Sequence, residues 1–533
     1  MGAAVPALAL ADFRERRRRP AYLVVLLGTL ALGLLAAPVG PSGWQIFQIG
    51  DYRGLYTSGY VGTVTALGGA VWLSLAGFSI TRGTVTKDDR SGVGQILAAT
   101  PMTRVSYLLG KFCSNLLVLG SMLLALAGTA LGVQLVKGES YSVDPVRLLL
   151  PFVLITLPLL ALVAACAVLF DTLPGLRGGG GALLWFVIWL VGMMASQASG
   201  GYDLLSMGPI GESMRTAIQA AGHPAGSVTF GVGLTSHDGP LTTFGWDGLG
   251  PGSVSGGPLA GAALLTVGAV VVTLLAGLWF RRFDPAVSAG AVGALVPGRT
   301  RASGPMPGPA AGPDESVTAP GASFAFAPAS MTPARRGSAF AATLAGELRV
   351  LLRGMRWWWL GPAALAVASV LVEAQDVSHP VLALSMLWPV LIWSRMGHHA
   401  DAGSLEDLLT ASPSAGRRLP AVLLAGVAVS LSVSVLPMVR LLAAGDHRAV
   451  AAALAGALAV PALALLCGTV SRGPRLFQAL YPLLWYGMFN RIAELDFLGV
   501  VPGGGPGPAA VAASALVLAL VALGTDGVRR ARR

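Results

Sequence analysis

Twelve apolar segments long enough to cross a bilayer are distributed along this chain. A hydrocarbon core of about 30 Å is crossed by roughly 20 apolar helical residues. Only 11% of the residues are charged and 54% are hydrophobic, so polar groups could not cover the apolar surface of a water-soluble fold. We therefore expect an all-α integral membrane protein. The predicted spans are 21–37, 61–80, 106–134, 148–170, 181–196 and 258–280 in the first half, and 357–374, 379–396, 419–439, 449–470, 476–490 and 508–525 in the second.

Basic residues gather on one side of these spans. With the N-terminus inside, the cytoplasmic side receives the runs at Arg16–Arg19 and 529–533, and few basic residues fall outside. Because cytoplasmic loops retain Lys and Arg, both termini are expected in the cytoplasm of a multi-pass protein of a bacterial cell membrane. The net charge of +11 then faces anionic membrane lipid. No nucleic-acid-binding module accompanies this charge, so nucleic acid is not an expected partner.

A linker divides the chain. Residues 283–340 are dominated by Gly, Ala, Pro and Ser, a composition that cannot bury a core and predicts a flexible cytoplasmic segment. It separates a first six-span unit, 1–282, from a second, 341–533. The second unit opens with an amphipathic helix at 341–356, expected along the inner membrane surface. The opening stretch of the chain, with Leu8 and Phe13, is a weaker version of this helix.

The loop after the second span of each half contains the same pattern. In both copies an Asp is followed by apolar residues at helical spacing and then by Pro, which predicts a short amphipathic helix opened by an Asp or Ser cap. The first copy comprises Asp89, Val93, Ile96, Leu97 and Pro101, and the second Asp401, Leu405, Leu408, Leu409 and Pro413. Both loops are expected on the same side of the membrane.

Further matches favour two tandem six-helix units in the same orientation. Leu183-Leu184-Trp185-Phe186 recurs as Leu483-Leu484-Trp485-Tyr486. After these two segments, Asp203-Leu204-Leu205 with Pro209 is matched by Asp496-Phe497-Leu498 with Pro502. The three cysteines all lie inside predicted spans, so no disulfide framework is implied.

The energy source is not expected on this chain. Lys111, Asp171, Glu373 and Arg440 lie near span ends, where they can reach lipid headgroups, and we expect no buried carboxylate to carry protons. The glycine run 178–181 lacks the Lys and Ser or Thr of a phosphate-binding loop.

The outer loop 197–257 contains four residues of types that bind metals: His223, His237, Asp238 and Asp247. Their spacing fits no metal motif, so we interpret them as solvated loop residues. We expect no enzymatic activity, cofactor or metal site here.

The first loop resembles the cytoplasmic loop of ABC-2 type permeases, the membrane subunits of many ABC exporters. The resemblance rests on Asp89-Arg90-Ser91-Gly92 followed by Gln95 to Arg104, placed after a second span in a six-span unit. It implies a coupling helix that docks on an ATP-binding subunit, with one such helix in each half and two ATPase copies as partners. The residues carried over are Asp89, Arg90, Val93, Ile96, Leu97 and Pro101, and Asp401, Leu405, Glu406, Leu408, Leu409 and Pro413.

The second copy departs from the first. Ala402 stands where the first copy has Arg90, and Glu406-Asp407 stand where it has Gly94-Gln95, so the two ATPase contacts are expected to be unequal. The fused arrangement resembles the polyketide-antibiotic exporters of this group. That resemblance implies ATP-driven export of an amphipathic small molecule such as a drug or antibiotic.

Other classes of protein fit the sequence less well. A secondary carrier of the major facilitator kind has a loop G-x-x-x-D-R/K-x-G between spans two and three, followed by a basic residue. Gly83 to Gly92 is a near miss, because the spacing from Gly83 to Asp89-Arg90 is too long and no basic residue follows before Arg104. A membrane-embedded transferase or protease requires clustered polar residues, and no such cluster repeats or pairs along the chain. A permease that signals without transporting remains a further alternative.

Overall fold

The structure is a computed structural model. It describes residues 4–36, 44–47, 49, 52–137, 139–197, 203, 205–223, 235–236, 242–250, 257–280, 338–353, 359–371, 381–397, 415–490, 492–500 and 505–531. Nearly all of the regular structure is helical, as the expected all-α class requires.

The first half contains the helices α1 (Ala4–Arg17), α2 (Pro20–Ala36), α3 (Ser58–Thr81), α4 (Thr84–Arg90), α5 (Val93–Ala98), α6 (Arg104–Lys137), α7 (Pro145–Pro151), α8 (Leu157–Thr172), α9 (Gly179–Gln197), α10 (Met207–Ala220) and α11 (Gly257–Trp279). A π-helical turn, Phe152–Thr156, joins α7 to α8. The second half contains α13 (Ala339–Leu352), α14 (Leu360–Leu371), α16 (Ala383–Leu387), α17 (Val390–Trp393), α19 (Ala415–Ala443), α20 (His447–Ser471), α21 (Arg475–Phe489) and α22 (Pro508–Ala531).

Eight helical segments among the described residues are long and apolar enough to cross a membrane. Shorter apolar helices lie at Tyr22–Leu34, Leu360–Leu371 and Ala383–Trp393. Each of the twelve predicted segments contains helix, the eleventh being the 15-residue α21. The chain is therefore a multi-pass membrane protein by helix length and composition.

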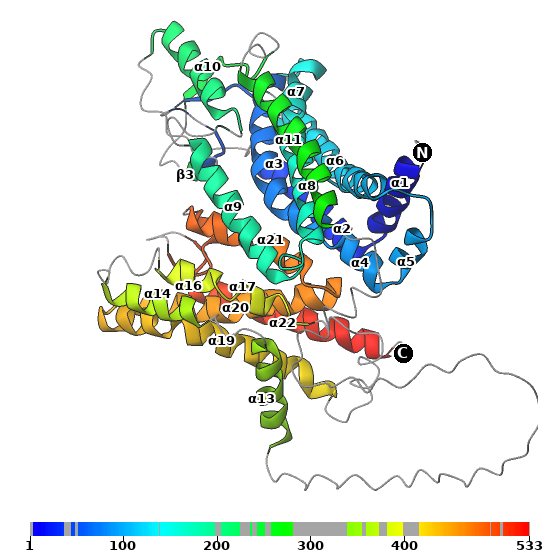
Figure 1. Ribbon diagram of the computed structural model, residues 1–533. Coiled ribbons are helices and arrows are strands. Elements are labelled where there is room, and N and C mark those ends of the chain that lie inside the picture. Colours follow the sequence, from blue (N-terminus) through cyan, green and yellow to red (C-terminus); the bar gives the residue numbers. More distant parts are fainter. Residues whose placement is uncertain are drawn as a thin grey trace, which may run out of the picture.

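The two halves lie against each other, and their long helices run in different directions (Figure 1). In that view α3, α6, α8 and α11 run up the page, whereas α19, α20 and α22 run across it.

The halves meet through reciprocal contacts. Helix α3 of the first half packs on α21 of the second, and α9 of the first packs on α17 of the second. The two matching sequence segments face each other at this interface. The ring centroids of Trp189 and Tyr486 are 5.0 Å apart, and those of Phe186 and Trp485 are 5.8 Å apart.

The described parts of the outer loop contain regular structure. Helix α10 occupies most of the stretch 203–221. Strand β1 (Trp44–Gln45) pairs antiparallel with β3 (Thr235–Ser236), and β2 (Tyr52–Gly54) pairs parallel with β4 (Thr242–Phe244). Trp246 packs on Phe47 and Tyr60, and Asp247 forms an ion pair with Arg147. Aromatic packing therefore holds the part of the loop around Trp246 against the first half. His237 and Asp238 lie outside the described residues.

Candidate functional site

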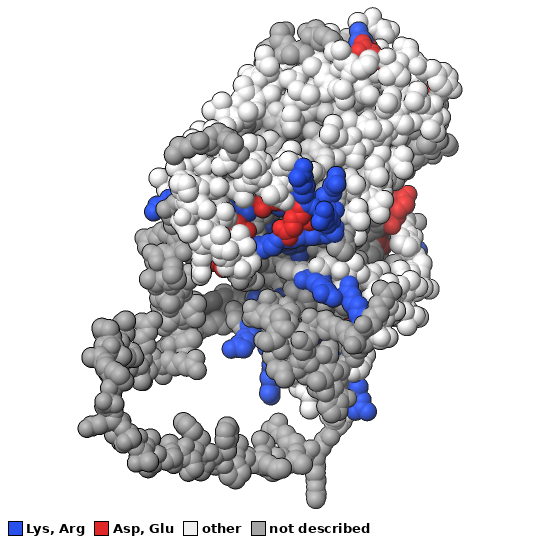
Figure 2. All heavy atoms as spheres, turned by 90° about the vertical axis from the view of Figure 1, so that its right-hand side faces the viewer, with Lys and Arg blue, Asp and Glu red and all other residues white. Residues whose placement is uncertain are grey.

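Charged side chains gather where the first half meets the second, at the end of the first half where α4 and α5 lie. Figure 2 shows this cluster of basic and acidic side chains below a broad surface with few charges. We call this the basal end. It contains the first copy of the repeated loop, and charged groups from α1, α4 and α6 contact one another there.

The first loop forms two short helices rather than one. Asp89 lies inside α4, and the N-cap of α5 is Gly92, whose φ of 74° suits a residue without a Cβ atom. The expectation that an Asp or Ser caps the helix was therefore wrong for this copy. Helix α5 ends at Ala98, and Pro101 follows shortly after it, as a helix stop requires.

The apolar face of α5 is divided between solvent and core. Val93 is 43% exposed and Ile96 is 70% exposed. Leu97 instead packs against the cluster of Val85, Tyr107, Leu108 and Phe280. Leu97 therefore fixes α5 to the helix bundle, whereas the side chains of Val93 and Ile96 are exposed on the surface. Asp89 and Pro101 are exposed, and Arg90 ends α4.

The second copy of the loop cannot be compared in the same way. Residues 398–414 lie outside the described part of the chain. The predicted residues concerned are Asp401, Leu405, Glu406, Leu408, Leu409 and Pro413.

Helix α4 is capped by a residue of another helix. Gly83, its N-cap, has no side chain to accept the free amides of the first turn. The carboxylate of Asp171, near the end of α8, accepts hydrogen bonds from the Gly83 amide at 2.8 Å and from the Val85 amide at 3.4 Å. The start of α4 is thereby fixed to α8.

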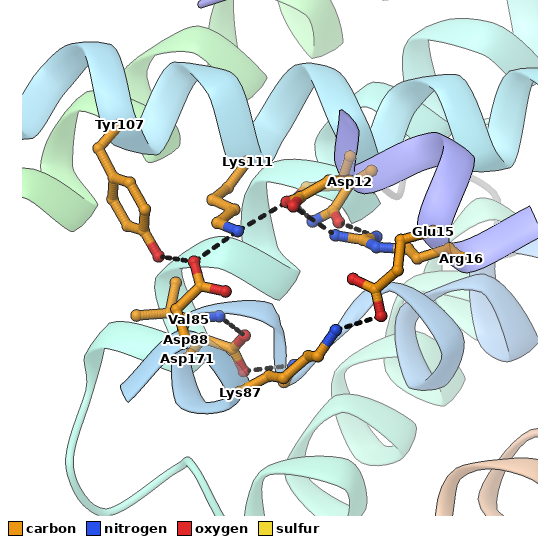
Figure 3. A network of polar contacts seen from close by, with 12 residues as sticks. Asp12, Glu15, Arg16, Val85, Lys87, Asp88, Tyr107, Lys111 and Asp171 are labelled. Atoms are coloured by element: carbon orange, nitrogen blue, oxygen red, sulfur yellow. Dashed lines mark hydrogen bonds and ion pairs between the residues drawn. The ribbon is translucent and has the colours of Figure 1, made fainter. Parts of the chain in front are cut away.

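A buried ion network fixes the other end of α4 (Figure 3). The Lys111 ammonium of α6 lies 2.6 Å from a carboxylate oxygen of Asp88 on α4 and 2.6 Å from one of Asp12 on α1. The Tyr107 hydroxyl donates to Asp88 at 2.7 Å. Lys111 is only 1% exposed, and an ammonium held so far from water requires this double compensation. The expectation that Lys111 reaches lipid headgroups was wrong, because its partners are protein carboxylates.

Helix α1 runs beside α6 in the same direction. Asp12 meets Lys111, Arg16 donates to Asn115 at 2.7 Å, and Tyr22 of α2 bonds Ser121, so the contacts advance together along both helices. Leu8 packs on Gly110, where a Cβ atom would come within 2.7 Å of its side chain. The opening stretch is thus a packed partner of α6.

The outer face of α1 carries a second set of charges. Glu15 bonds Arg19 at 2.7 Å and also bonds Lys87 of α4. Partial burial alone would raise the pKa of Glu15, but the hydrogen bonds from Arg19 and Lys87 lower it to about 2. Burial lowers the pKa of Arg16 to about 10, partly opposed by Asp12, so Arg16 remains charged at neutral pH. Helix α1 is therefore tied to both α4 and α6.

The basal end also contacts the second half. The guanidinium of Arg475, at the start of α21, donates to the Gly83 carbonyl at 3.3 Å. The Ser79 hydroxyl donates to the Gln478 carbonyl at 3.4 Å. The junction between α3 and α4 is therefore bonded directly to α21.

A simpler arrangement occurs in the second half. Helix α13 packs on α19, as α1 packs on α6. Arg418 of α19 lies 2.8 Å from Glu347 of α13. In both halves an acid on the amphipathic helix therefore meets a base near the start of the helix that follows the repeated loop.

Three buried carboxylates occur among the described residues, but none lies at mid-span, where the sequence predicted no carboxylate that could carry protons. Asp88, Asp171 and Asp496 are all at most 7% exposed. Asp496 accepts hydrogen bonds from the Leu498 and Val500 amides. All three carboxylates accept bonds from the protein, and none belongs to the middle of a long apolar helix. Asp171 is bonded to backbone amides rather than directed to headgroups. Arg440 contacts the Ser369 carbonyl, and Glu373 lies outside the described residues.

The network residues were not recognised from the sequence as site residues. One local signal was present: Asp12 and Arg16, and Glu15 and Arg19, are spaced i, i+4 on α1, as helical ion pairs require. The contacts of Asp12 with Lys111 and of Asp171 with Gly83 join residues far apart in the chain, which periodicity does not reveal.

Comparison with known proteins found no matching family model, curated protein or solved structure.

Proposed function

We propose that this chain is the membrane subunit of an ATP-driven exporter of the ABC-2 type, and that α5 docks on a separate ATPase subunit. The observation that supports this most is the display of Val93 and Ile96 on α5. Two apolar side chains projecting from a loop otherwise rich in charge suit a protein partner, because burying them in its surface is favourable.

The bonding of α4 suits it to transmit movement. It is fixed to α8 by Asp171, to α6 by Lys111, and to α1 through Glu15. A force applied at α5 would therefore move these helices together rather than bend the loop. Through Gly83 and Arg475 the same movement would reach α21 and the second half. ATP-driven closure of two ATPase subunits would then pivot the halves against each other.

The reciprocal packing of α3 on α21 and of α9 on α17 supports two tandem units of six spans each. Contacts of this kind are typical of two copies of one unit related by a two-fold axis. We propose that the second ATPase docks at 401–413, and that the shared side is the cytoplasmic face of a bacterial cell membrane. The cargo would be an amphipathic small molecule that leaves the cell between the halves.

Replacing Ile96 by Asp tests the docking surface. Burial of an isoleucine contributes roughly 1.5–3 kcal/mol, so the change should weaken ATPase binding by about 100-fold. The matched control is Gln95→Glu, which adds a negative charge to the same helix without removing an apolar contact. Co-purification with the ATPase from the producing cells would be measured. Binding retained by Ile96→Asp would contradict the docking assignment.

The energy source separates this proposal from a secondary carrier. Transport into inverted vesicles should require ATP and the ATPase subunit, and it should continue when an uncoupler collapses the proton gradient. We expect this because Asp88 and Asp171 are held by protein donors at helix ends. Loss of transport with the uncoupler at constant ATP would favour proton coupling.

A further inference from the structure

A charged cavity of about 540 Å³ lies at the basal end, between the two halves. Its walls come from α1, α2, the junction of α3 and α4, α6, the turn before α9 and the turn before α21. Eight Lys and Arg side chains and three Asp and Glu side chains line it, so the lining carries a formal charge of +5. Such a cavity attracts anions, and its low-dielectric walls strengthen that attraction.

Some of the residues that line this cavity carry buried donor atoms without a hydrogen-bond partner. In the part of the chain that the structure describes, six buried side-chain atoms lack a hydrogen-bond partner, and three of them belong to cavity-lining residues. They are Arg16 Nη2, Thr84 Oγ1 and Thr86 Oγ1. Arg16 is 8% exposed and Thr84 is 7% exposed. Arg16 Nη2 lies 3.9 Å from a carboxylate oxygen of Asp12, an ion pair that is longer than a hydrogen bond. Buried polar groups are normally hydrogen-bonded, so these three atoms can each donate to an acceptor from outside the protein.

Two helix N-termini add to the positive potential. Helix α9 begins at Gly179 and α21 at Arg475, and the first residues of both line the cavity. Neither Gly179 nor Pro474, the N-cap of α21, offers a side chain that could accept the free amides. Amides and dipoles at helix N-termini favour phosphate and similar oxyanions.

Apolar side chains also line the cavity. They are Val25, Ile80, Val118 and Leu476, beside the charged groups. The cavity volume of about 540 Å³ is many times the roughly 30 Å³ that one water molecule occupies in the liquid, so the cavity has room for far more than one small oxyanion. A ligand that fills it therefore combines a charged group having several acceptor oxygens with an apolar body.

We propose that this basal cavity binds the phosphate group of an amphipathic molecule. The guanidinium of Arg16 and the hydroxyls of Thr84 and Thr86 donate to the phosphate oxygens. The adjoining hydrocarbon packs against the apolar side chains that line the cavity. The source of the phosphate is either the headgroup of an anionic phospholipid or a phosphorylated compound. This goes beyond the exporter proposal and does not depend on ATPase docking.

Binding is tested on the purified full-length protein in neutral detergent, without an ATPase. One arm titrates phosphatidylglycerol, a second titrates inorganic phosphate, and a third titrates phosphatidylcholine, whose headgroup has no net charge. Native mass spectrometry counts bound lipid, and the rise in unfolding temperature reports occupancy for all three probes.

The variants remove donors while preserving shape or surface. Thr84→Val with Thr86→Val removes both hydroxyls at nearly constant volume, and Arg472→Gln removes a cavity-lining charge at an exposed position. The control, Arg104→Gln, removes an exposed charge at the start of α6, outside the cavity lining. Each hydroxyl would donate one hydrogen bond to a charged group, so the double Thr variant should weaken phosphate binding by about tenfold or more.

The outcomes separate the possibilities. Saturable phosphatidylglycerol binding that the cavity variants weaken and the control does not supports the site with lipid as the source. Binding of inorganic phosphate alone, with the same dependence on variants, supports the site with a phosphorylated compound as the source. Equal binding of phosphatidylcholine, equal weakening by Arg104→Gln, or no binding of either phosphate probe would overturn the proposal. Unchanged elution on size exclusion confirms that each variant is folded.

Discussion

The two amphipathic helices α1 and α13 are held by the same kind of contact, but to different extents. Helix α1 is bound through Asp12 to a lysine that is 1% exposed and also holds α4. Helix α13 is bound by the Arg418–Glu347 pair, whose side chains are 20% and 16% exposed. The first contact links three helices and the second links two. We infer that the first half transmits movement from its loop more rigidly than the second.

Removing Lys111 should have the largest effect on this comparison. Lys111→Met leaves Asp88 buried and Asp12 partly buried, close together and without their shared cation. Breaking one partner of a buried ion pair costs about 3–5 kcal/mol, so the free energy of unfolding should fall by that amount. Unfolding of the purified protein in denaturant measures it.

The control for Lys111→Met is the triple variant Lys111→Met, Asp12→Asn and Asp88→Asn. It removes the charges together and should recover most of the lost stability. A single Lys111→Met variant as stable as the natural chain would show that the Lys111 network holds its helices no more firmly than the Arg418–Glu347 pair holds α13.

The second loop should contribute less to ATPase binding than the first. Leu408→Asp, matched to Ile96→Asp, should weaken binding by about tenfold rather than 100-fold, because Glu406 and Asp407 already give this copy a different polar surface. Affinity for the purified ATPase would be measured for both variants side by side. Equal losses would mean that the two loops are equivalent despite their sequences.

Separating the Arg418–Glu347 pair should have the smallest effect. Glu347→Gln keeps the shape and one possible hydrogen bond, and pairs with partial exposure contribute at most about 1 kcal/mol. The same unfolding measurement applies to Glu347→Gln, to Arg418→Met and to the chain that carries both changes, which together with the natural chain form a double-mutant cycle. A loss as large as that of Lys111→Met would remove the difference between the halves.

Much of the fold could be predicted from the sequence because apolar length is a local property. Every predicted span contains helix, and even the short α21 was located by its apolar run. The strands β1 to β4 were not predicted, because each has only two or three residues and pairs across a long separation. The packing of Trp246 on Phe47 and Tyr60 was not predicted either, because these residues are also far apart in the sequence.

The site was predicted only in part. Spacing located α5 and its exposed Ile96, but it could not divide the apolar face between solvent and core, so Leu97 was grouped with Val93. Lys111 and Asp171 were noticed, but their partners depend on how α1, α4 and α8 pack. Side chains that serve as caps or ion partners for other helices have no periodic signature.

The contact between the matching segments at Phe186 and Trp485 has a consequence for how the interface can change over time. When identical chains form a two-fold dimer, each substitution appears twice and has to suit both sides at once. Here the two sides belong to one polypeptide, so Phe186 faces Trp485 while Tyr486, at the matching position, faces Trp189. Each side can therefore acquire changes that the other compensates, and the covalent connection ensures that the compensated sides always meet.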